Sequence, residues 1–196
     1  MRRALVTLLV LGFAVAGAAR AQQYGIDVVS YHFTIALDST PGVRVQATVA
    51  FRRSPGAGAR LLLDLVGMTV DSVVNADTAT RVPFEYDGRR LSIPITSQAA
   101  QRVLVGYHGT PADGLIARAT ARGRPAAFGD NWPERARLWL ATVDHPSDKA
   151  EVSWLIENIP SGWRVVANGA CHPVPGRPAV RCAERACALT TNSEAI

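Results

Sequence analysis

Hydrophobic and polar residues alternate along most of the chain beyond residue 26. From Asp27 to Leu37 every second side chain is apolar, at Val29, Tyr31, Phe33, Ile35 and Leu37. An alternation with a period of two is typical of a β-strand that has one buried face. The sequence therefore predicts a half-buried strand over 27–37, with His32 among the residues of its polar face.

Turn residues divide the alternating pattern into hairpins. After the segment 38–42, which contains Pro41 and Gly42, the alternation resumes from Val43 to Phe51. The dipeptide Asp87-Gly88 is typical of a tight turn and separates the alternating segments 82–86 and 91–95. Further alternation predicts strands at 61–65, 70–74, 103–107, 152–156 and 163–167.

The arrangement of these segments indicates an all-β fold. Beyond the first 21 residues no stretch shows the 3.6-residue apolar period of a helix over a useful length. Short strands between frequent turns predict a β-sandwich or a curved two-sheet domain. A chain of 196 residues has room for one such domain with a substantial core.

Residues 1–21 have the features of a secretory signal peptide. Arg2 and Arg3 precede an apolar stretch over 4–16, and Ala19 and Ala21 form an A-x-A cleavage site. The alternative, a membrane anchor, is disfavoured because the apolar stretch is short for a bilayer. We therefore expect a periplasmic or extracellular protein with no membrane span after removal of this segment. Three arginines lie in the segment, so its removal lowers the formal net charge from +5 to +2, which gives no support for nucleic-acid binding.

The composition changes after Gly169, and residues 170–196 are expected to be a divergent, irregular tail beyond a β domain over 22–169. All three cysteines lie in this tail, namely Cys171, Cys182 and Cys187. A disulfide between two of them is favoured in an exported protein, and a small zinc site that includes His172 is the weaker alternative. One hypothesis for the tail is a frameshift or premature stop shortly after Gly169.

The motifs of the common hydrolases are absent from the sequence. A hydrolytic zinc site needs clustered His and carboxylate ligands, as in HExxH, but the four histidines are scattered. GxSxG and the glycine-rich phosphate loops do not occur either. We predict no catalytic residues, no metal site and no cofactor in this chain.

The segment 128–150, FGDNWPERARLWLATVDHPSDKA, mixes aromatic residues, prolines and charges without periodicity. From spacing alone it is predicted to be a packed loop. In that interpretation Trp132 and Trp139 fill the edge of the core, and Arg137 pairs with a carboxylate such as Asp144. A ligand site in the same segment is the alternative.

This segment resembles the N-terminal domain signature of the aminopeptidase N family of zinc metallopeptidases. The matching residues are Pro133, Ala136, Arg137, Asp144, Pro146, Lys149 and Ala150. The segments 31–38, 61–73, 107–114 and 162–169 are similar to that family too. The resemblance implies a saddle-like antiparallel β-sandwich that packs on a thermolysin-like catalytic domain.

The resemblance also implies a role for the loop. In the family two residues of a Q-x-E-P segment help to hold the free α-amino group of a peptide substrate. The corresponding positions here are Asp130 and Trp132, of which only Asp130 is anionic. The family's zinc-binding helix follows the N-terminal domain, so zinc is expected only in a full-length relative.

The expected function is therefore that of a non-catalytic N-terminal domain of an exported zinc aminopeptidase. Its partners would be the catalytic domain and peptide substrates. The alternative function is a stand-alone secreted β-sandwich module that binds peptides or other ligands.

Overall fold

The computed structural model describes residues 25–37, 42–119, 125–145, 147–167 and 169–183. In these residues the chain forms strands and one short 3₁₀ turn, without an α-helix. The elements are β1 (Ile26–Leu37), β2 (Val43–Arg53), β3 (Arg60–Asp64), β4 (Thr69–Asn75), β5 (Thr80–Arg81), β6 (Glu85–Tyr86), β7 (Arg90–Pro94), β8 (Ala100–Gly109), β9 (Leu115–Ala119), β10 (Pro125–Gly129), η1 (Ala136–Leu138), β11 (Glu151–Glu157), β12 (Ala170–Pro173) and β13 (Val180–Ala183). The all-β prediction is confirmed.

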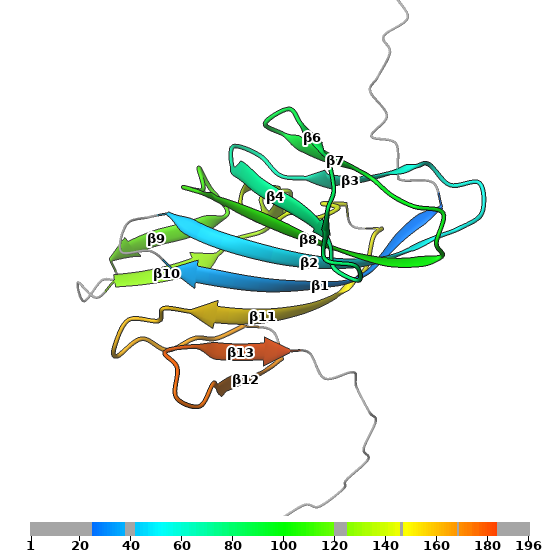
Figure 1. Ribbon diagram of the computed structural model, residues 1–196. Coiled ribbons are helices and arrows are strands. Elements are labelled where there is room, and N and C mark those ends of the chain that lie inside the picture. The colour runs from blue at the N-terminus through cyan, green and yellow to red at the C-terminus, as the bar shows by residue number, and fades with distance from the viewer. Residues whose placement is uncertain (1–24, 38–41, 120–124, 146, 168, 184–196) are drawn as a thin grey trace, which may run out of the picture.

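One large curved sheet organises the domain (Figure 1). Its eight strands follow the order β12-β13-β11-β1-β2-β8-β4-β5. A three-stranded sheet, β3-β7-β6, and a two-stranded sheet, β10-β9, accompany it. No helix in the described part is long and apolar enough to cross a membrane.

Both hairpins that the alternation predicts are present. β1 pairs with β2 in antiparallel register, with Phe33 opposite Ala47, and β6 pairs with β7 around the Asp87-Gly88 turn. The register shifts between Val28 and Ser30, so Val28 rather than Val29 is buried. A β-bulge of this kind inserts one residue and reverses the facing of the residues before it.

The core lies between the large sheet and the β3-β7-β6 sheet. Alternate residues of β1, β2 and β8 contribute side chains such as Phe33, Val45 and Val105, and Leu61 and Leu91 contribute from the small sheet. All five side chains are at most 1% exposed. Burying alternate apolar residues of two facing sheets is the main source of stability in such a fold.

The large sheet is mixed and not purely antiparallel, which corrects one part of the expectation. β1 pairs with β11 in parallel, with Phe33 beside Trp154. Period-two alternation is the same in parallel and antiparallel strands of a one-sided sheet, so the sequence pattern carried no information on this direction.

Two local expectations differ from the structure. The predicted strand over 163–167 is irregular, and Val166 is 91% exposed. Conversely, the β9–β10 hairpin was not expected. It pairs the segments LIARA and PAAFG, which show no alternation of apolar and polar residues.

The expectation of an irregular tail from residue 170 does not hold for residues 170–183. β12 and β13 form an antiparallel hairpin, and β13 adds to β11 with Leu155 opposite Arg181. Cys171 and Cys182 face each other across the hairpin and form a disulfide. The preference for a disulfide over a zinc site is thus confirmed, while Cys187 lies outside the described residues. An ordered, register-matched hairpin argues against a frameshift before residue 183.

Candidate functional site

Two buried tyrosines of the large sheet hold the signature loop, which we define as residues 130–148. The Tyr107 hydroxyl donates to the carbonyl of Trp139 and accepts from the amide of Ala141, each at 3.1 Å. The Tyr31 hydroxyl accepts from the amide of Val143 at 2.9 Å. Burial raises the pKa of both phenols well above its ordinary value, so both remain neutral hydroxyl groups.

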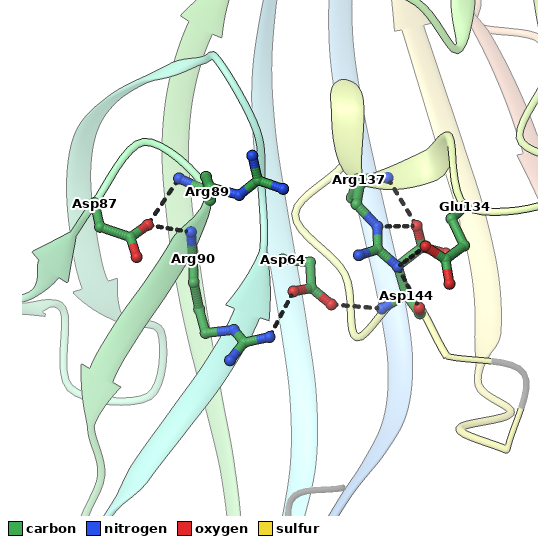
Figure 2. A network of polar contacts seen from close by, with 7 residues as sticks. All are labelled: Asp64, Asp87, Arg89, Arg90, Glu134, Arg137 and Asp144. Carbon is green, nitrogen blue, oxygen red and sulfur yellow. Dashed lines mark hydrogen bonds and ion pairs between the residues drawn. The ribbon is translucent and has the colours of Figure 1, made fainter. Parts of the chain in front are cut away.

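A buried ion pair closes the signature loop on itself (Figure 2). Arg137, only 8% exposed, donates from Nε to Asp144 Oδ2 at 2.8 Å and from Nη2 to the Asp144 carbonyl at 2.9 Å. Glu134 lies 3.4 Å from the same guanidinium. The predicted pairing of Arg137 with Asp144 is therefore confirmed, and it joins two positions in the interior of the loop.

Asp64 ties this loop to the small sheet (Figure 2). Its carboxylate accepts from the Asp144 amide at 3.3 Å and lies 3.3 Å from the guanidinium of Arg90. Its backbone exchanges hydrogen bonds with Thr142 in an isolated bridge. Arg90 in turn donates its amide to Asp87, whose side chain caps the β6–β7 turn.

The first part of the signature loop is held by contacts with Asp113 and Gly114. Asp130 forms an ion pair with Arg135, which also lies 3.4 Å from Asp113. The Asp130 amide donates to the Gly114 carbonyl at 2.7 Å. Gly114 has a φ of +81°, and an added Cβ would lie 2.4 Å from the Arg135 carbonyl oxygen. Only glycine therefore fits at position 114, where the backbone passes close to the Arg135 carbonyl.

Between the signature loop and the large sheet lies an open pocket of about 650 Å³. Its floor is aromatic, with Tyr31 stacked on Phe33 at 5.7 Å between ring centroids and Phe33 on Trp154 at 5.2 Å. Trp132, 80% exposed, stands on the loop side of the lining. The pocket therefore joins an apolar floor to a loop that carries charges.

The charged side chains of the pocket lining are acidic. They are Glu134, Asp144 and Asp148, and in the part of the chain that the structure describes the other titratable lining residues are His145 and Tyr31. Two lining residues also carry buried oxygen atoms without a hydrogen-bond partner, Asp148 Oδ2 and Thr142 Oγ1. Burial, and secondarily the charge of Asp27, raises the pKa of Asp148 against the opposing effect of a backbone hydrogen bond from Val28.

The structure separates the sequence-predicted site residues. Trp132 and Pro133 line the pocket, while Asp130 lies in its ion pair beside the pocket. Trp139 is buried as expected, but the expectation that Trp132 fills the core edge is wrong because its side chain is largely exposed. Lys149 is exposed, and Pro146 lies outside the described residues.

Sequence reasoning missed Asp64, Thr142 and Asp148. Asp64 sits within an alternating strand, where a polar residue on the outer face gives no signal. Thr142 and Asp148 line the pocket beside residues of β1, which lies more than 100 positions earlier in the sequence. The one available hint was the density of polar and aromatic residues in the segment 128–150.

The described residues do not fit a zinc ion. Among them there is no group of three or more His, Cys, Asp or Glu side chains that could hold a metal. His32 bonds with Ser153, His108 with Asp71 and His145 with Ser147, so the histidines of these pairs lie apart from one another. The cysteines of the hairpin are bonded to each other.

Comparison with known proteins gives a consistent structural result. No protein-family model matches the sequence, and no curated protein matches it. Among solved structures, native yeast LTA4 hydrolase matches with a TM-score of 0.71 at 18% identity, over 82% of this chain and 27% of the hydrolase. An M1 zinc metallopeptidase from Deinococcus radiodurans matches with a TM-score of 0.66 at 22% identity, over 83% of this chain and 40% of the peptidase.

A mutant of the Deinococcus peptidase bound to a Tyr-Ser-Ala substrate matches with a TM-score of 0.65. The chain thus spans less than half the length of these proteins. A match over most of this chain and a minor part of each peptidase corresponds to one domain. The chain has the fold of a β domain of the M1 zinc metallopeptidases.

Proposed function

We propose that this chain is the non-catalytic N-terminal domain of an exported zinc metallo-aminopeptidase. In the full enzyme it packs on the catalytic domain, which supplies zinc. The observation that carries the proposal is the fold, together with a signature loop in which the paired residues Arg137 and Asp144 stand at positions that match the family pattern. The lack of a metal-ligand group among the described residues is compatible with this division of labour.

The first part of the signature loop is the element that would meet the amino end of a peptide. Trp132 projects from it with most of its ring accessible, and the Asp130 carboxylate lies two residues before it. An indole face attracts an ammonium group weakly, and a carboxylate attracts it strongly. Because Asp130 is already paired with Arg135, we propose that it contributes charge at the rim of the substrate site and does not act alone.

The experiment that tests this function is to sequence the gene beyond the codon for Ile196 and translate it in all three frames. We expect HExxH followed by a further glutamate, the ligand set of a catalytic zinc helix. A downstream region without such a motif in any frame would refute the proposal and leave a separate domain.

Export is part of the same proposal. Residues 1–21, which lie outside the described residues, are proposed to direct the chain to the periplasm or the medium, where the disulfide forms readily. Amino-terminal sequencing of the exported protein should begin at Gln22. A cytoplasmic, uncleaved chain would refute this part alone.

The second candidate is a stand-alone secreted module that binds peptides or other ligands. The observation in its favour is the open pocket with an aromatic floor, since pockets of a few hundred Å³ suit small ligands. Peptide binding by the chain alone, combined with a gene that encodes no zinc motif downstream, would select this second function.

A further inference from the structure

The pocket under the signature loop has an excess of negative charge. Among the described residues its lining contains the carboxylates of Glu134, Asp144 and Asp148 and no lysine or arginine side chain. Arg137 neutralises part of this charge from behind the loop, where it contacts Asp144 and Glu134. Asp64 adds a further carboxylate behind Asp144, and Arg90 offsets the negative charge of Asp64. Among the described residues Asp148 makes no ion pair with a lysine or arginine, and the groups that favour its charged form are the Val28 amide and His145.

Two lining residues carry oxygen atoms that lack hydrogen-bond partners. Asp148 Oδ2 and Thr142 Oγ1 are buried oxygen atoms that can accept hydrogen bonds, and leaving such an atom without a donor is unfavourable. Most buried polar atoms in proteins have a hydrogen-bond partner, so two such atoms without one, in residues that line the same pocket, require an explanation. A ligand with several N–H donors would satisfy both after a small adjustment of the loop.

The aromatic residues of the pocket favour the same class of ligand. Trp154 lies on the floor, and the exposed Trp132 lies on the loop side. Indole is the best aromatic partner for a cation, and a planar guanidinium also stacks on it. Aromatic rings combined with carboxylates are the chemistry that recognises an organic cation.

We propose that this pocket binds the cationic side chain of a peptide, with a guanidinium or a primary ammonium held by Asp148 and Glu134 against Trp132 and Trp154. The pocket volume of about 650 Å³ admits a whole long side chain with its backbone. The inference concerns a side-chain site on this chain. It does not rest on the aminopeptidase function proposed above, in which a free α-amino group is recognised at Asp130.

The test uses blocked amino acids and the full chain. Nα-acetyl-arginine amide and Nα-acetyl-lysine amide carry a side-chain cation but no free α-amino group, and Nα-acetyl-citrulline amide is a neutral shape match for arginine. Binding is followed by tryptophan fluorescence and calorimetry. We expect at least one cationic probe to bind about tenfold more tightly than citrulline amide, with an affinity that falls as salt is added.

Substitutions locate the site. Asp148→Asn and Glu134→Gln should each weaken binding of the better probe by about threefold to thirtyfold, and Trp132→Ala by about threefold to tenfold. Glu151→Gln is the matched control, because Glu151 is exposed at the start of β11, next to the lining residue Val152, and is itself absent from the lining. Trp132 is largely exposed, so its replacement reports on the site even if a loop carboxylate variant folds poorly.

Each outcome is decisive. Equal binding of arginine amide and citrulline amide, absence of binding by both cationic probes, or an equal loss in Glu151→Gln would overturn the inference. If peptides with a free α-amino group bind while both blocked cations do not, the side-chain site is refuted and the amino-end role of the loop survives. If the blocked cations bind and the gene encodes no zinc motif, the site stands and the aminopeptidase function falls.

Discussion

Single residues of the core anchor the signature loop, and Tyr107 illustrates how. Its side chain is fully buried and makes two hydrogen bonds to the loop backbone, to Trp139 and Ala141. Tyr107→Phe leaves both backbone groups without a partner in the core. We expect the free energy of unfolding in urea to fall by about 1–3 kcal/mol.

Tyr86 offers a matched control for that substitution. Its hydroxyl donates a hydrogen bond to the Leu65 carbonyl at 3.1 Å, and its side chain is only partly buried. Water can replace this bond, so Tyr86→Phe should cost clearly less. Equal losses in the two variants would contradict an anchoring role for Tyr107.

Asp148 is expected to make stability depend on pH. Its folded pKa lies above its ordinary value, chiefly through burial, so the native chain binds a proton more tightly than the unfolded chain. Between the two pKa values the native state therefore holds more protons, and its stability falls as pH rises from about 4 upward. In Asp148→Asn this decline should disappear.

Urea unfolding of both proteins at several pH values checks that expectation. The stability of Asp148→Asn relative to the natural chain should rise with pH and level off once pH exceeds the folded pKa. Parallel curves for the two proteins across this range would show that Asp148 is not shifted upward. The sequence could not reveal the shift, because Asp148 is desolvated by its position near Val28, a residue 120 positions away.

At the scale of elements, the signature loop depends on a short-range ion pair. Arg137 and Asp144 have side chains that are 9% and 14% exposed. Removing one partner of a buried pair leaves the other charge uncompensated. We expect Arg137→Ala to lower the free energy of unfolding by about 3 kcal/mol or more, as measured by urea denaturation.

Arg102 and Asp77 form a comparable pair on the surface, with side chains that are 57% and 38% exposed. Solvent screens such a pair, so Arg102→Ala should cost less than about 1 kcal/mol. A loss in Arg137→Ala no larger than in Arg102→Ala would contradict a stabilising role for the Arg137–Asp144 pair.

The elements themselves divide into those that the sequence could predict and those that it could not. β1, β2 and β8 follow from alternation, because each has one face in the core and one that is more exposed. β12 is short, and its residues are partly or fully exposed, so no alternation marks it. The segment 163–167 is the opposite case, in which alternation is present but no strand forms. Trp163, Val165 and Ala167 alternate with exposed residues, but in the described part of the chain the segment has no partner strand.

The candidate site shows the same division. The pairing of Arg137 with Asp144 was predictable because the two residues lie seven positions apart in one loop. The pocket could not be predicted from the sequence, because its floor comes from β1 and β11 and its wall from the loop between β10 and β11. A parallel pairing of β1 with β11 brings these segments together, and period-two alternation does not encode strand direction.

At the scale of the whole molecule, the β12–β13 hairpin completes one end of the large sheet. β13 lies between β11 and β12, so it has a hydrogen-bonded neighbour on both sides. Without the hairpin, β11 would present an unpaired edge, which invites association with other chains. The hairpin is therefore expected to be an integral part of the domain and not an appendage to it.

Proline substitution in β13 tests this view of the molecule. Arg181 is exposed and lies opposite both Leu155 and His172, so Arg181→Pro loses a backbone donor within the sheet and little side-chain packing. Arg164→Pro makes the same change of charge in the irregular segment and serves as the control. We expect Arg181→Pro to lower the melting temperature by several degrees and to speed amide exchange in β11, with little effect from Arg164→Pro. If exchange increased only within 170–183 and β11 stayed protected, the hairpin would be a separate unit, and the sheet would end at β11.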